Sequence, residues 1–165
     1  MPASLHSPER KPAISATMLN PALISAAIAW AATRYEQAAK EAMPWEYSFI
    51  SVPLTLHQET RRALPRKVTA HLPKWINEHP TLIAGFAPRA RRLVPHVREG
   101  VRFGLRTGLF VLVDEGRVSG RIPARVKLDR DSEMGEIVSS AAFTGAWLAR
   151  AGVPTHVFTM FGVMP

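Results

Sequence analysis

The chain has 165 residues, no cysteine and a formal net charge of +8. This length suits one domain with a core of its own, and the lack of cysteine excludes disulfides and thiolate zinc sites. The N-terminus lacks a charged start followed by an apolar run, and no apolar stretch is long enough to span a bilayer. We therefore expect a cytoplasmic protein that makes no membrane contact.

The first half of the chain predicts several short helices, because proline recurs often. Residues 1–19 are polar and without period, and we expect a flexible N-terminal arm there. Asn20-Pro21 marks the start of a helix that continues to about Ala42. Segment 45–57 is aromatic and β-branched but contains Pro53, which predicts a short extended piece followed by a turn.

Short helices are expected next over residues 58–64 and 73–79, each bounded by proline. Residues 80–94 are also helical in pattern, with a break or kink at Pro88 as an alternative. We expect Pro95 to open a further helix that Gly108 ends. The expected apolar face of that helix comprises Val94, Val97, Val101 and Leu105, and a basic stripe comprises Arg98, Arg102 and Arg106.

The periodicity then changes to that of strands. Residues 109–113 and 117–126 flank the turn sequence DEG and predict a β-hairpin, with Arg117, Ser119 and Arg121 on its outward face. Asp131-Ser132 caps a last helix to about Arg150, and the apolar tail is expected to be an ordered end that packs against another surface. The fold class is therefore mainly α with a small β-hairpin. This order of elements is typical of a winged helix-turn-helix, so residues 20–165 are expected to form one winged-helix-like domain.

No pattern of a catalytic site is present in the sequence. No two histidines are spaced i, i+4, no serine lies in G-x-S-x-G, and the glycines of segment 100–108 are not followed by the Lys-Ser/Thr of a P-loop. We therefore expect a protein that is not an enzyme and that needs neither a metal nor a cofactor.

Positive charge is concentrated in residues 88–130, which contain eleven Arg and Lys but only four Asp and Glu, giving +7. Such a block predicts an anionic partner, either DNA or an acidic protein surface, and a merely solvated surface is the alternative. The candidate binding residues are Arg89, Arg91, Arg92, Arg98, Arg102, Arg106, Arg117 and Arg121. In the tail, Phe158 and Phe161 are the candidates for a partner interface.

Several stretches resemble one family in order along the chain. They include NPAL at residue 20, VPLTLH at residue 52, WINEHPTLIAGFAPRARRLVPHVREGVRFGL from residue 75, GAWLARAG at residue 145 and VFTMFGVMP at the end. Together they resemble the middle component of bacterial three-component ABC systems. The resemblance extends from Asn20 to Pro165.

That resemblance implies an adaptor without catalytic activity. It would couple an SMC/Rad50-like ABC ATPase to a third component, an effector or sensor encoded in the same operon, in anti-phage defence. Double-stranded DNA is a possible further partner through the complex. The alternative function is a free-standing winged-helix protein that binds DNA through its arginines.

Overall fold

A computed structural model describes residues 16–123 and 126–164 of the chain. Most of the expected N-terminal arm lies outside these residues. Its last four residues form a 3-10 turn, η1 (Ala16–Leu19). Met18 and Leu19 pack against the hydrophobic core, so this end of the expected arm is part of the domain.

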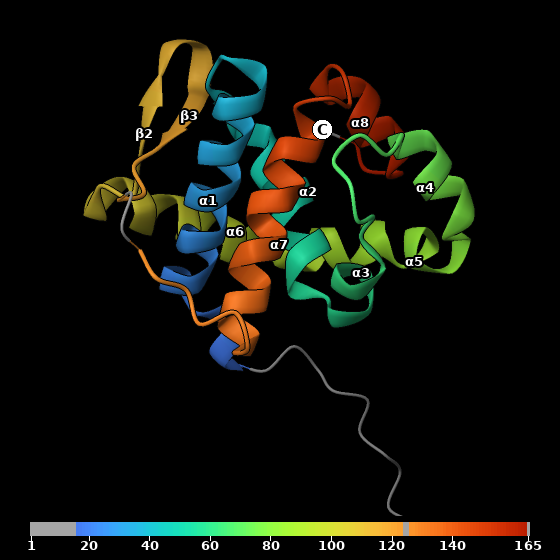
Figure 1. The fold of residues 1–165 in the computed structure, drawn as a ribbon, viewed down its shortest axis with the longest axis horizontal. Coiled ribbons are helices and arrows are strands. Elements are labelled where there is room, and N and C mark those ends of the chain that lie inside the picture. The colour runs from blue at the N-terminus through green and yellow to red at the C-terminus, as the bar shows by residue number, and fades with distance from the viewer. Residues whose placement is uncertain (1–15, 124–125, 165) are drawn as a thin grey trace, which may run out of the picture.

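The described residues form mainly helices and one small sheet (Figure 1). The helices are α1 (Pro21–Ala39), α2 (Ser48–Leu56), α3 (Gln58–Ala63), α4 (Leu72–Glu78), α5 (Pro80–Ala84), α6 (Phe86–Thr107), α7 (Glu133–Leu148) and α8 (Pro154–Met160), with 3-10 turns η2 (Trp45–Tyr47) and η3 (Asp114–Gly116). The strands are β1 (Met43–Pro44), β2 (Phe110–Val113) and β3 (Arg117–Gly120). The sequence-based fold class, mainly α with a small hairpin, is confirmed.

The sheet contains one strand more than the expected hairpin. Its order is β1-β3-β2 and both pairings are antiparallel, with Met43 opposite Val118 and Phe110 opposite Gly120. The strand β3 is therefore central, and the chain just after α1 is tied to the hairpin that follows α6. Two-residue strands such as β1 give almost no periodic pattern, which explains why the sequence did not predict it.

The core forms around α1. Helices α1, α2 and α7 lie side by side, and α6 crosses behind them (Figure 1). Helices α4, α5 and α8 lie at the end of the molecule away from the sheet (Figure 1). Fully buried side chains come from all the long helices and from the C-terminal segment, including Ile24, Ile28, Ile50, Leu54, Phe86, Ile137, Trp147 and Phe161.

Two glycines allow α6 and α7 to lie close to α1. A Cβ atom on Gly145 of α7 would overlap the backbone carbonyl of Ala31, and a Cβ atom on Gly100 of α6 would lie 2.5 Å from Cγ2 of Ile24. The α1 side chain at the Gly145 contact is also small, since Ala31 is buried there. Close packing of backbones raises the number of van der Waals contacts that each residue makes.

The local rules for helix ends are confirmed. The side chain of Asn20 accepts a hydrogen bond from the backbone N–H of Ala22 at 2.9 Å. At the start of α7, the hydroxyl of Ser132 accepts one from the backbone N–H of Gly135 at 3.0 Å. Gly108 ends α6 with a positive φ of 73°. These positions depend on the flanking residues alone, so sequence patterns predict them well.

The expectation of an extended piece over residues 45–57 is wrong. This segment forms η2 and then α2, with Pro53 inside the helix and all of residues 50–56 buried. A helix that is apolar on every side belongs in the interior of a protein. Burial of this segment against α1, α6 and α7 therefore outweighs the one hydrogen bond that Pro53 cannot donate.

The expected break at Pro88 and new helix at Pro95 are also wrong. The break lies at Gly85, and α6 then continues for 22 residues through both prolines. Pro88 falls in the first turn of α6, where a backbone N–H would have no carbonyl acceptor within the helix, so the missing N–H costs no hydrogen bond. The buried side of α6 comprises Phe86, Arg89, Ala90, Leu93, Val97, Gly100 and Gly104, so of the expected apolar face Val97 alone is fully buried.

The close approach of α7 to α1 predicts that Gly145→Ala destabilises the protein. The added methyl group would meet backbone atoms of Ala31, which cannot rotate away. We expect a loss of about 2 kcal/mol or more in the free energy of unfolding, which is on the order of 5 °C in Tm. Ser139→Ala on the same helix is the control and should change Tm little. Thermal unfolding followed by circular dichroism measures both, and equal Tm values would contradict the packing argument.

Candidate interaction surfaces

Five arginines of α6 form a ridge on the side of the helix that faces solvent. A residue advances about 100° around a helix, which places positions 91, 98, 102 and 106 opposite the buried side of α6. All four side chains are exposed, and so is Arg92 at the edge. We call these five residues the arginine ridge. They are the part of the expected basic surface that the structure brings together.

The ridge carries little compensating charge. Arg102 forms an ion pair with Glu99 one turn before it, and both side chains are more than half exposed. Such surface pairs contribute little to stability and exchange readily for other partners. The ridge therefore presents a strongly positive strip, one helix long, to any anionic surface.

Arg89 does not belong to the ridge. It is 9% exposed and lies on the buried side of α6. Its guanidinium donates to the hydroxyl of Thr60 at 3.2 Å and to the carbonyl of Gly85 at 3.3 Å, and it lies 5.6 Å from the centre of the Phe86 ring. The expectation that it contacts DNA or a partner is thus corrected: Arg89 joins α6 to α3. Burial is the main reason why its pKa is lowered, and the nearby Arg92 adds to the effect.

The hairpin offers fewer free charges than its sequence indicated. Arg117 is half-buried, donates to the carbonyl of Ala42 at 2.9 Å and pairs with Glu41 at 3.4 Å. Ser119 is buried and donates to Glu36 of α1 at 2.8 Å. Of the expected outward face, therefore, Arg121 alone is fully exposed. The correction follows from the central position of β3, which has α1 beside it.

The tail phenylalanines lie inside the protein. Phe158 is 5% and Phe161 0% exposed, and the ring of Phe161 packs on that of Phe86 with centroids 4.6 Å apart. The tail is packed, as expected, and the surface that it packs on belongs to the chain itself. Their expected role at a partner interface is corrected, since neither ring is available on the surface.

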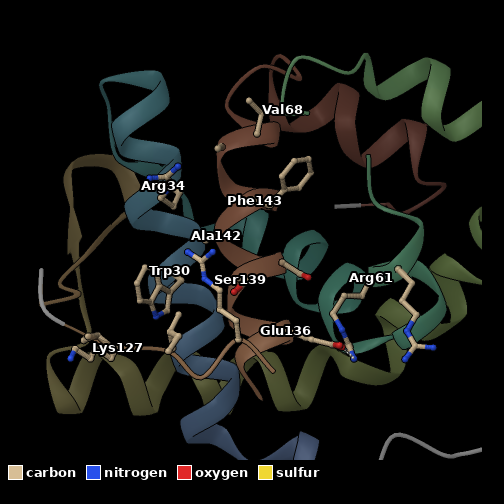
Figure 2. Close-up of a pocket in the computed structure, with 15 residues that line it drawn as sticks. Trp30, Arg34, Arg61, Val68, Lys127, Glu136, Ser139, Ala142 and Phe143 are labelled. Atoms are coloured by element: carbon tan, nitrogen blue, oxygen red, sulfur yellow. Dashed lines mark hydrogen bonds and ion pairs between the residues drawn. The ribbon is translucent and has the colours of Figure 1, made fainter. Parts of the chain in front are cut away.

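A second surface, which sequence analysis missed, is a hollow of about 1000 Å³. It lies between α1, α3, α7 and residues 126–130, and we call it the basic groove. Figure 2 shows Trp30 and Arg34 on α1, Lys127 on the connecting segment, and Ser139, Ala142 and Phe143 along α7. Its charged lining is Arg34, Arg61, Arg62, Lys127, Arg130 and Glu136.

Arg61 anchors one wall of the groove. Its side chain is 2% exposed and donates to the carbonyl of Thr55 at 2.7 Å. It pairs with Glu136 at 3.4 Å and with Glu133 at 3.6 Å. A buried guanidinium requires such partners, so α3 is held to the first turn of α7 and the groove wall is fixed.

No three metal-ligating side chains gather in the part of the chain that the structure describes. No helix within that part is both long and apolar enough to cross a bilayer.

Comparison with known protein families gives a match over nearly the whole chain. Residues 9–165 match the family described as ABC-three component (ABC-3C) system Middle Component 3. The chain belongs to this family. The resemblance that its motifs showed is thereby confirmed, and the match includes both the arginine ridge and the basic groove of this Middle Component 3 protein. No curated protein and no solved structure matches the chain.

His57, the N-cap residue of α3, is placed to respond to pH. Its Nδ1 caps α3, at 3.3 Å from the backbone nitrogen of Thr60 and 2.8 Å from its hydroxyl. Burial lowers the pKa of His57, and Arg89 and Arg61 lower it further, whereas Glu59 opposes the shift. Neutral His57 is therefore the form that the folded protein favours.

We expect acidification from pH 7.5 to 5.5 to lower Tm. The unfolded chain takes up a proton at His57 near its usual pKa of about 6.5, while the folded chain does so at lower pH, so stability is lost as pH falls through this window. His57→Asn keeps a capping oxygen but cannot titrate, and its Tm should fall less over the same range. Tm measured against pH for both proteins tests this, and parallel curves would refute the role of His57.

Proposed function

We propose that this Middle Component 3 protein is a non-catalytic adaptor in a bacterial anti-phage defence system. It would couple an SMC/Rad50-like ABC ATPase to the third component, the effector or sensor of the same operon. The observation that carries the proposal is the family match over residues 9–165, because the family description names a three-component ABC system. A middle component of such a system is expected to contact other components.

The arrangement of the surfaces supports this proposal. Ile24 and Ser25 of α1 face α6, whereas Trp30 and Arg34 of the same helix line the groove. The ridge lies on the far side of α6 from α1, so ridge and groove lie on different faces of the molecule. An adaptor needs two separate contact surfaces, and this protein offers two that differ in shape: one convex and charged, the other concave and partly apolar.

The test is purification of the tagged protein from its native operon, with the co-purifying chains identified by mass spectrometry. We expect an SMC/Rad50-like ATPase and a third operon product in stoichiometric amounts. Arg98→Glu combined with Arg106→Glu should deplete at least one of them, because like charges across an interface are unfavourable. Lys74→Glu combined with Arg150→Glu makes the same change in charge outside α6 and should deplete neither. Purification of the wild-type protein alone would refute the adaptor proposal.

A second candidate function is binding of double-stranded DNA, and the arginine ridge favours it. The long helix α6 leads directly into the hairpin β2–β3, the order that predicted a winged helix-turn-helix. In that arrangement α6 is the recognition helix and the hairpin the wing. No Asn or Gln occurs in α6, so its contacts would be with phosphates and largely independent of sequence.

If the ridge binds DNA, affinity should fall steeply with salt. Each phosphate contact contributes about −0.9 to the slope of log K against log salt concentration, so Arg98→Ala with Arg106→Ala should make the slope about two units shallower. Fluorescence anisotropy with a labelled duplex, measured at several salt concentrations, gives both slopes. Arg66→Ala with Arg150→Ala removes the same charge from exposed positions outside α6 and is the control. A slope near zero for the wild-type protein would exclude this function.

A further inference from the structure

The basic groove carries positive charge that the residues described by the structure do not neutralise. Arg34, Arg62, Lys127 and Arg130 line it and are exposed. None of these four side chains takes part in the ion pairs formed among the described residues. Arg61, the fifth cation, is offset by Glu136 and Glu133. Four cations therefore border a hollow in which Glu136 is the one carboxylate among the lining residues.

Between these charges the groove surface is apolar. Trp30 of α1 and Phe143 of α7 are both partly exposed, and Val126 at the rim is 43% exposed. Figure 2 shows Trp30 and Phe143 on either side of the small side chains of α7, Ser139 and Ala142. A concave surface with an apolar floor and polar groups at its rim is the usual form of a binding site for a ligand or a peptide.

We propose that the basic groove binds an acidic, amphipathic segment of another protein component of the system. Apolar side chains of that segment lie against Trp30 and Phe143, and its carboxylates pair with Arg34, Lys127 and Arg130. The proposal rests on the proposed adaptor function and names the surface and the kind of segment that would provide one of its contacts. Charge complementarity is the reason for choosing this occupant.

Nucleic acid fits the groove less well than an acidic peptide. Single strands bind where successive bases stack on a series of exposed aromatic rings. Here two rings come from different helices, and one of them, Phe143, already packs on Trp147 with centroids 6.1 Å apart. A peptide needs no such series of rings, because its apolar side chains can lie against Trp30 and Phe143 while its carboxylates pair with the cations around them.

The experiment uses the full chain and 15-residue peptides that tile the sequences of the two other operon products. Each labelled peptide is titrated with the protein and followed by fluorescence anisotropy. We expect binding by tiles that combine net negative charge with aromatic or leucine side chains. Arg34→Glu with Lys127→Glu should weaken this binding at least about tenfold, because it places like charges opposite each other. Lys74→Glu with Arg150→Glu is the matched control and should leave the affinity unchanged.

Trp30→Ala provides an independent readout of the apolar floor. It should weaken the same peptides while leaving the salt dependence of binding unchanged, because no charge is removed. Circular dichroism confirms that each variant is folded before the comparison.

Three results would overturn the groove proposal: no tile binds, the groove variant binds as tightly as the wild type, or oligo(dT) binds the wild type but not the groove variant. Failure of the adaptor function is recognised separately, because the intact operon products would then not co-purify with the wild-type protein. If they co-purify with the wild-type protein while any of these three results is obtained, the adaptor function stands and the groove proposal fails.

Discussion

The close approach of three elements to α1 determines the shape of this protein. Gly145 of α7, Gly100 of α6 and Gly120 of β3 each face α1 at points where a Cβ atom would collide with it. Because α1 is thus covered by α7, α6 and the sheet, little of its surface remains free. Trp30 and Arg34 lie on that remaining strip and line the basic groove. The packing that stabilises the core therefore also decides which α1 residues are available for binding.

The fold was predictable where local chemistry determines it. The caps at Asn20 and Ser132 and the end of α6 at Gly108 follow from side-chain and backbone properties of a few neighbouring residues. The helix α2 and the continuation of α6 through Pro95 were not predictable in this way. In both cases burial against distant elements outweighs an unfavourable proline, and a single sequence does not show which elements will be neighbours.

The same distinction applies to the candidate surfaces. The arginine ridge follows from spacing within one helix, so the sequence indicated most of its members. Arg89 was misplaced because the helix was expected to begin anew at Pro95; once α6 is continuous, its spacing of four from Leu93 puts it on the buried side. The groove combines residues from α1, α3, α7 and the segment after β3. No pattern in the sequence predicts that these segments lie next to one another.

The packing of α1 also has a consequence for synthesis of the protein on the ribosome. The contacts that cover α1 and the segment after it come from far along the chain, as in the hydrogen bond from the Tyr47 hydroxyl to the carbonyl of Gly152, 105 residues away. While the intervening residues are being translated, the apolar side of α1 and the buried helix α2 have no native cover. Nascent chains in this state tend to aggregate. Early capture by a chaperone, or by a neighbouring gene product made at the same time, would protect them.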